Sequence, residues 1–251
     1  MENKKIIYYK QLDSSNTEIA RLATQGAEHG TVVVADAQTA GKGRRGRGWE
    51  SPAGENIYMS ILLRPDCVPD RAPMLTLVMA YAVAKVLREF GFADVQIKWP
   101  NDLVLSGKKI CGILTEMQIK EAAIDYVVVG VGINVNTSKF PQELKETATS
   151  LYLESGRILD REKIVESVVD YFYKAYRQFI EVQDLSFLRE AYNNMLVNVG
   201  REVRVLEPRN EYTAYAQGIN SEGELLVRMS DGEEKHVYAG EVSVRGIYGY
   251  V

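Results

Sequence analysis

One short segment of the chain has a composition that suits the binding of an anion. Residues 41–48 read GKGRRGRG, four cations and four glycines without an acidic residue, and Trp49 follows directly. Glycines allow the backbone to turn and to approach a ligand closely, while Lys and Arg supply charge and donors that match phosphates and carboxylates. We refer to residues 41–48 as the basic loop and predict that it holds an anion.

Three other interpretations of the basic loop fit the sequence less well. A phosphate-binding P-loop reads GxxxxGK[ST]; two glycines have this spacing, but Arg47 and Gly48 follow, so the hydroxyl that ligates magnesium is missing. An Arg-Gly segment can bind nucleic acid, although the chain has a net charge of −4 and no repeated motif. A solvated surface loop is the ordinary explanation of a short charge run, but Gln38 and Trp49 flank this one. An active-site loop for an anionic intermediate is therefore the preferred interpretation.

A second group of polar residues lies at the end of a predicted strand. Residues 98–102 read KWPND, and Lys109 follows seven positions after Asp102. Charged, aromatic and amide groups crowded at one strand end are costly when they serve structure alone. A salt-bridged strand end would explain one of these residues but not all five. We therefore predict that this segment and Lys109 belong to the same site as the basic loop.

Composition narrows the class of protein. Of the 251 residues, 46% are hydrophobic and 25% are charged, which is usual for a globular protein. No apolar run reaches the roughly 18 residues that span a bilayer. Cys67 and Cys111 fit no metal or redox spacing, and His29 and His236 stand alone, which disfavours a zinc site or a Ser-His-Asp triad. We expect a cytoplasmic protein that does not associate with a membrane.

Hydrophobic periodicity predicts two structural parts. The first is an α+β domain over residues 1–197. Its first helix would begin with a capping box at Ser15–Glu18. The predicted strands cover 6–10, 31–35, 56–63, 95–99, 103–105, 110–118 and 126–135, the last one buried on both faces. The other predicted helices cover 73–90, 150–154, 161–182 and 185–196. Strands over 202–206, 212–219, 224–229 and 234–238 predict a small β-barrel domain within residues 198–251.

Taken together, these segments closely resemble the biotin–protein ligase family. The matching pieces follow the family order: DSSN at 13–16, QTA at 38–40 with the basic loop and Trp49, KWPND at 98–102, Lys109 with GIL at 112–114, and GVGIN at 130–134. The C-terminal β region also resembles the small domain of these ligases. The resemblance implies a class II synthetase-like fold, a mixed β-sheet flanked by helices. Ser15 stands where Thr is frequent in the family, and Lys42 where Arg is frequent.

The resemblance implies a two-step reaction. The biotin carboxylate reacts with ATP to give biotinyl-5′-AMP and pyrophosphate, and biotin then passes to one lysine of a biotin carboxyl carrier protein or domain. The first step needs preorganised positive charge, because a carboxylate must approach the α-phosphate. Mg²⁺ is implied with the ATP. The second step requires no nucleophile from the enzyme.

The resemblance also implies which residues form the site. The catalytic residues would be Arg44 and Lys109, with Asp102 orienting Lys109. No side chain is assigned as a direct metal ligand, and Asp102 is the one candidate. The implied biotin contacts are Ser14, Ser15, Asn16, Gln38, Gly41, Lys42, Gly43, Arg44, Lys109 and Gly112. The implied ATP and adenylate contacts are Lys42, Arg44, Arg47, Trp49, Asn101, Lys109 and Asn134.

Two other functions fit parts of the same sequence. Lipoate–protein ligase performs the same chemistry on a related fold, but the basic loop and KWPND favour biotin. A nucleic-acid-binding module would use the basic loop and the barrel, and it would leave Gln38 and Lys109 without a role.

The resemblance also bears on the partners. Family members often pair through an exposed sheet edge, so we expect a homodimer. We expect no DNA binding, because Asp13 lies too near Met1 to leave room for the helix-turn-helix domain of some members.

Overall fold

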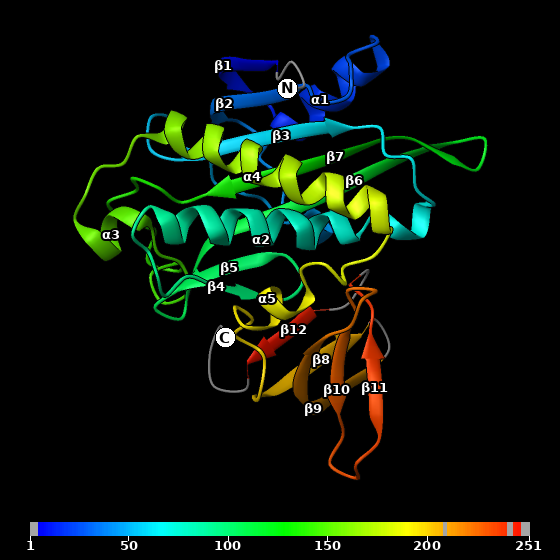
Figure 1. Ribbon diagram of the computed structural model, residues 1–251. Helices are drawn as coiled ribbons and strands as arrows, with labels where there is room; N and C mark the ends of the chain where they lie inside the picture. The colour runs from blue at the N-terminus through cyan, green and yellow to red at the C-terminus, as the bar shows by residue number, and fades with distance from the viewer. Residues whose placement is uncertain (1–4, 208–209, 240–242, 247–251) are drawn as a thin grey trace.

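The central feature of the chain is a mixed β-sheet with a smaller sheet beside it (Figure 1). The computed structural model describes residues 5–207, 210–239 and 243–246. The strands of the large sheet are β1 (Ile6–Leu12), β2 (Val32–Gln38), β3 (Ile57–Leu63), β4 (Gln96–Lys98), β5 (Asp102–Leu105), β6 (Lys108–Lys120) and β7 (Ala123–Ile133). Their order is β1-β2-β3-β7-β6-β5-β4. Only β1 and β2 pair in parallel, so the predicted mixed sheet is confirmed.

Helices cover both faces of the large sheet. Helices α2 (Met74–Glu89) and α4 (Arg161–Val182) lie on one face, where α2 packs against both α4 and the sheet (Figure 1). Eleven of the 16 residues of α2 are buried, which explains why its sequence is so apolar. Helix α1 (Ser15–Thr24) packs on the opposite face against β2, β3 and β7. Short helices complete the set: η1 (Arg44–Gly46), η2 (Pro69–Arg71), α3 (Leu151–Ser155) and α5 (Arg189–Asn193).

From Tyr126 to Ile133, strand β7 is covered on both faces, as its apolar sequence predicts. Val127, Val129 and Val131 belong to the large core that includes α2 and α4. Tyr126 and Val128 belong instead to the smaller core under α1. Alternate residues of a strand point to opposite faces, so a strand that is covered on both sides is apolar at every position.

The C-terminal part forms a five-stranded antiparallel sheet. Its strands are β8 (Glu202–Glu207), β9 (Asn210–Ile219), β10 (Leu225–Arg228), β11 (Glu234–Val237) and β12 (Ser243–Gly246), in the order β11-β10-β9-β8-β12. Within the described part of the chain, β11 and β12 form the two edges and do not pair, so the expected barrel is not closed. The sequence did not predict β12, which has only four residues.

Two local predictions are wrong. Helix α1 has Ser14 as its N-cap without a side-chain cap bond, so the capping box at Ser15–Glu18 does not form. The Ser15 hydroxyl lies 2.8 Å from that of Ser60, and Glu18 pairs with Arg21, so neither side chain serves as a cap. The helix expected over 185–196 is shorter, Arg189–Asn193, and it ends early because the following backbone pairs with Ile97 of β4. The Ile97 N–H donates to the Met195 carbonyl, and the Val197 N–H donates to the Ile97 carbonyl.

The tryptophan of KWPND joins the two sheets. Trp99 is 1% exposed, and its indole Nε1 donates to the carbonyl of Gly223 at 3.0 Å. Its backbone N–H donates to Oδ1 of Asn198 at 3.0 Å. This side chain therefore serves the core and the junction with the C-terminal sheet. Among the described residues, no helix combines the length and apolar character that crossing a membrane requires.

Replacing Trp99 by Phe should lower the free energy of unfolding by about 1–3 kcal/mol, because the Gly223 carbonyl would lose its donor inside the protein. Chemical denaturation followed by circular dichroism measures this change. Tyr192→Phe is the matched control, since the buried Tyr192 hydroxyl has no partner among the described residues and its removal should cost nothing. Equal destabilisation by both substitutions would contradict the role of the Trp99 hydrogen bond.

Candidate active site

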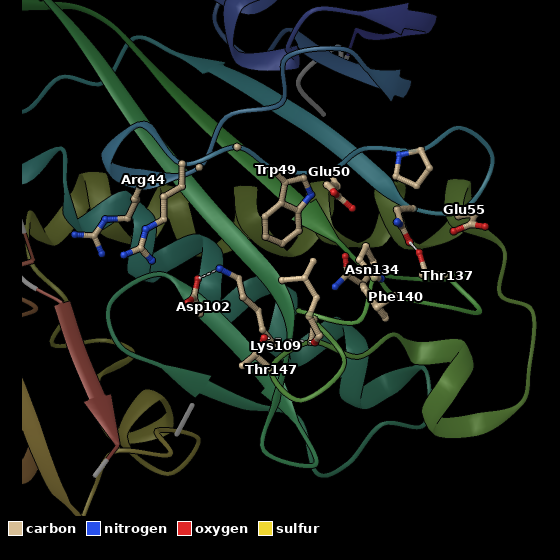
Figure 2. Close-up of a pocket in the computed structure, with 18 of the residues that line it drawn as sticks. Arg44, Trp49, Glu50, Glu55, Asp102, Lys109, Asn134, Thr137, Phe140 and Thr147 are labelled. Carbon is tan, nitrogen blue, oxygen red and sulfur yellow. Dashed lines mark hydrogen bonds and ion pairs between the residues drawn. The ribbon is translucent and has the colours of Figure 1, made fainter. Parts of the chain in front are cut away.

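Two adjoining cavities open where the basic loop meets β5, β6 and β7. The larger cavity has a volume of about 350 Å³ and the smaller about 50 Å³. Figure 2 shows Arg44, Trp49, Asp102 and Lys109 pointing into the larger one. The residues that line both cavities are Gly43, Arg44, Trp49, Asn101 and Lys109. Residues from the basic loop, KWPND and β6 thus meet, although they are far apart in sequence.

The basic loop is a short hairpin closed at its base by Trp49. The Trp49 N–H donates to the Gly41 carbonyl at 2.9 Å, and the Gly43 N–H donates to the Arg47 carbonyl at 2.7 Å. A Cβ atom on Gly41 would lie 2.3 Å from the Trp49 carbonyl oxygen, so this position accepts only glycine. Gly41 lines neither cavity, and its place in the site is at the base of the hairpin.

Arg44 is held by groups from two other segments. Its Nη1 donates to Oδ1 of Asn101 at 2.9 Å, and its Nη2 donates to the carbonyl of Ala239 at 2.8 Å. Burial lowers the pKa of this guanidinium from its ordinary value. The basic loop is therefore fastened to KWPND and to the C-terminal part through one side chain.

Lys109 and Asp102 form an ion pair at the junction of the two cavities. Lys109 Nζ lies 2.6 Å from Asp102 Oδ1, and both side chains are partly buried (Figure 2). The ammonium also lies 5.1 Å from the centre of the Trp49 ring, a distance suited to a cation–π contact. Asp102 and the indole together fix where the Lys109 charge lies.

A second lysine lies behind this ion pair. Lys98 of β4 is directly opposite Asp102 of β5 in the antiparallel register, so the two side chains project from the same face. Lys98 is only 5% exposed. Burial, with smaller contributions from Lys109 and Arg245, lowers its pKa to about 8 against the opposing effect of Asp102.

Glycines in β6 and β7 leave the space that two site residues occupy. A Cβ atom on Gly132 would lie 2.8 Å from the Trp49 ring, and one on Gly112 would lie 3.1 Å from it. A Cβ atom on Gly130 would lie 1.9 Å from Oδ1 of Asn16. The glycines of GVGIN therefore act by omitting side chains, which lets an indole and an amide lie directly on the sheet.

The smaller cavity is lined by the polar residues of α1 and β2 that the sequence predicts. The Ser15 N–H donates to Oε1 of Gln38 at 2.8 Å, and Nε2 of Gln38 donates to Oγ of Ser51 at 2.8 Å. The predicted residues in its lining are Ser14, Ser15, Asn16, Gln38, Lys42, Gly43, Arg44, Trp49, Asn101, Lys109 and Gly112. The larger cavity adds Arg47, Asp102 and Asn134.

The sequence did not predict one wall of the larger cavity. Residues 137–148, between β7 and α3, contribute Thr137, Lys139, Phe140, Pro141, Leu144, Thr147 and Ala148. The Lys109 N–H donates to the Thr147 carbonyl at 2.8 Å, which holds this segment beside Lys109. The only available signal is the apolar pair Phe140-Pro141 within a polar stretch.

The described residues offer no ready metal-binding cluster. No group of three or more His, Cys, Asp or Glu side chains in that part of the chain is arranged to hold an ion. His236 pairs with Glu224 in the C-terminal sheet at 2.8 Å, and His29 packs on Tyr176 of α4. Neither histidine lines the two cavities.

Comparison with known proteins agrees with this arrangement. Residues 8–134 match the Biotin/lipoate A/B protein ligase family, and residues 199–245 match the Biotin protein ligase C terminal domain. The chain is 37% identical over 241 residues to Bifunctional ligase/repressor BirA of Bacillus subtilis, covering 95% of this chain and 74% of that protein. It is 31% identical over 227 residues to Biotin--[acetyl-CoA-carboxylase] ligase of Paracoccus denitrificans, covering 88% and 93%.

A solved structure shows the same architecture over nearly the whole chain. The biotin protein ligase from Aquifex aeolicus, in complex with biotin and ATP, superimposes with a TM-score of 0.84 at 32% identity. The match covers 97% of this chain and 99% of that one. The chain belongs to the biotin/lipoate A/B protein ligase family. Within that family, the Paracoccus denitrificans relative and the Aquifex aeolicus structure are named as biotin ligases, as the sequence motifs predict.

Lys98→Met should remove a rise in stability at alkaline pH. Because the folded pKa of Lys98 is about 8, below the ordinary 10.5, the unfolded chain binds more protons between these values, and stability rises with pH there. Over this pH window, the unfolding free energy of the wild type should rise by roughly 2–3 kcal/mol relative to that of Lys98→Met. Urea titrations at several pH values measure the gain, with surface Lys120→Met as the baseline. Unfolding free energies of wild type and Lys98→Met that change with pH in parallel would contradict the lowered pKa of Lys98.

Proposed function

We propose that the chain is a biotin–protein ligase, which activates biotin with ATP and transfers it to a lysine of a biotin carboxyl carrier domain. The observation that carries this function is the position of Lys109 and Arg44, which line both cavities. A carboxylate in one cavity and a triphosphate in the other would meet at these two cations. Preorganised positive charge at such a meeting point stabilises the transition state of acyl-phosphate formation.

In this proposal the ureido end of biotin lies at the smaller cavity, and its carboxylate extends to the junction with the larger cavity at Lys109. Ser14, Ser15 and Gln38 would contact the ureido ring, and Gly112 would lie along the valeryl chain. Asn16, Lys42 and Gly43 complete the biotin side, with Gly41 shaping the hairpin above it. The pocket offers hydroxyl, amide and backbone groups beside apolar walls, as a neutral polar ring on an aliphatic chain requires.

The larger cavity would hold ATP and then the adenylate. Its lining includes the cations Arg44, Arg45, Arg47, Lys109 and Lys139. The Trp49 indole Nε1 is buried without a hydrogen-bond partner among the described residues, so it is a donor that a ligand can use. Asn101 and Asn134 add amide groups, and residues 137–148 provide an apolar surface for the nucleobase.

Lys109 would lie beside the biotin carboxylate and the α-phosphate, held there by Asp102, while Arg44 would neutralise the developing charge. We also propose that Mg²⁺ accompanies the ATP and is held mainly by phosphate oxygens. The donor set fits such an ion, because Mg²⁺ commonly takes one or two carboxylates and several oxygens from phosphates and water. Asp102 is the one carboxylate of the site that we assign near it.

The partners in this proposal are the carrier domain and a second copy of the chain. Beyond Gly112, strand β6 pairs with β7 alone among the described residues, and its Met117 and Ile119 side chains are exposed. An open sheet edge of this kind can pair with another strand.

We further propose that the chain has two domains, residues 1–197 and 198–251, and that it does not bind DNA. We also propose a cytoplasmic location, which is consistent with the free cysteines Cys67 and Cys111.

Incubation with biotin, Mg²⁺ and ATP should give biotinyl-AMP, detected by mass spectrometry. Lys109→Ala and Arg44→Ala should each lower its rate of formation by about 10²- to 10³-fold, while the fold is retained by circular dichroism. Lys108→Ala is the matched control, because Lys108 points away to the Lys145 carbonyl. In a parallel incubation with lipoate in place of biotin, formation of lipoyl-AMP by a protein that forms no biotinyl-AMP would overturn the substrate, and wild-type rates in both variants would overturn the site.

Sedimentation velocity tests the homodimer. The wild type should sediment as a dimer at micromolar concentration, and Ile119→Lys should shift it towards monomer by placing charge on the β6 edge. Ile158→Lys alters another exposed apolar residue away from that edge and should have no effect. A monomeric wild type, or a dimer unaffected by Ile119→Lys, would contradict pairing at this edge.

A further inference from the structure

A chain of hydrogen bonds runs from the surface of β6 to the floor of the smaller cavity. Glu116 Oε2 accepts from Asn16 Nδ2 at 2.7 Å, Asn16 Oδ1 lies 2.6 Å from Ser60 Oγ, and Ser60 Oγ lies 2.8 Å from Ser15 Oγ. Asn16 and Ser15 line the cavity, whereas Ser60 and Glu116 do not. Ser60 is 0% exposed and Asn16 is 4% exposed, so water does not compete for these groups.

The partners of Asn16 determine which way its amide points. Glu116 and the Leu114 carbonyl, 3.3 Å away, both lie on one side of it. A carboxylate and a carbonyl only accept hydrogen bonds, so the NH₂ group must face them. Gly130 on the neighbouring strand leaves room for this placement, since a Cβ there would lie 1.9 Å from Asn16 Oδ1. The Asn16 oxygen is therefore directed at Ser60.

The direction of the Asn16 amide fixes the next two hydroxyl groups. A hydroxyl carries one proton, and Ser60 must donate it to Asn16 Oδ1, because two facing acceptors at 2.6 Å would repel. Ser60 then has only lone pairs for Ser15. The Ser15 hydroxyl must therefore donate its proton to Ser60 at 2.8 Å. Only lone pairs of Ser15 Oγ remain for a group in the cavity.

We propose that Glu116, Asn16 and Ser60 are positioning residues that hold Ser15 as a hydrogen-bond acceptor, so that the cavity selects a ligand with a ureido N–H. This inference rests on the proposed biotin-binding function. Ser60 and Glu116 act through Ser15 and do not touch the ligand. The chain begins at a carboxylate, and a bond to a charged acceptor is stronger than one to a neutral acceptor.

Gln38 supplies the complementary donor beside this acceptor. Ser51 Oγ donates to the Trp49 carbonyl at 3.0 Å, so it must accept from Gln38 Nε2. Gln38 Oε1 then accepts from the Ser15 N–H, and the second N–H of Gln38 Nε2 is available to a ligand. An acceptor on Ser15 next to a donor on Gln38 matches the N–H and C=O of one cyclic urea.

The test compares biotin with two cyclic-carbamate analogues, in which a ring oxygen replaces one or the other ureido N–H. Isothermal titration calorimetry gives Kd for each ligand, and the ratio of carbamate Kd to biotin Kd measures the selection. The wild type should reject at least one carbamate by about 10- to 100-fold, because an oxygen would then face the Ser15 lone pairs. In Ser60→Ala the Ser15 hydroxyl can turn and donate, so the ratio should fall to within about threefold.

Two Glu116 variants give a second, independent measurement at an exposed position. Glu116→Gln keeps an acceptor for Asn16, whereas Glu116→Met removes it at similar size, and both remove the charge that lies 4.0 Å from Lys42. The Met variant should show a lower ratio than the Gln variant. Thr31→Val removes a buried hydroxyl at the far end of β2, where it donates to the Glu28 carbonyl, and should leave the ratio unchanged.

The outcomes separate this inference from the proposed function. A wild-type protein that binds no biotin would overturn the proposed function itself. A wild type that binds biotin but accepts both carbamates equally well would overturn only the selection by Ser15. An unchanged ratio in Ser60→Ala would do the same. Should Ser60→Ala fail to fold, equal ratios in Glu116→Met and Glu116→Gln would overturn it.

Discussion

The site depends on how closely the Trp49 indole can approach β6 and β7. The ring lies where Gly112 and Gly132 have no side chains, and a Cβ at either position would press against it. With the ring there, the backbone N–H of Trp49 closes the base of the basic loop on the Gly41 carbonyl, and the indole lies under the ammonium of Lys109. One packing constraint thus bears on the position of the loop, the lining that the two cavities share and the place of the Lys109 charge.

The positive charge of the site is local and fixed. The chain as a whole carries a net charge of −4, yet five cations line the larger cavity. Arg44 is tied to Asn101 and to the carbonyl of Ala239, and Lys109 is tied to Asp102. Charges held in advance by the protein need not reorganise when a reaction develops charge. The anchor at Ala239 also makes the C-terminal part contribute to the geometry of the basic loop.

Sequence patterns predicted the long elements well, because apolar periodicity reports directly which face of an element is buried. Strands β3 and β7 and helices α2 and α4 lie close to their expected ranges. The wrong predictions concern short segments, whose structure depends on contacts with residues far away in the chain. The capping box is absent because Ser15 bonds to Ser60, the helix after Leu185 ends where the chain joins β4, and β12 exists only through pairing with β8.

The sequence by itself determined the chemical groups of the site and their order: the basic loop, KWPND, Lys109 and GVGIN identify a family. Only the tertiary structure decided what each group does. It placed Trp99 in the core and Trp49 in the site, although both stand in motifs that carry the family resemblance, and it revealed the wall at residues 137–148. It also set the hydrogen-bond direction at Ser15 through Glu116, 101 positions away along the chain. Residue type fixes which bonds a side chain can make, but donors and acceptors choose their partners only when folding brings them together.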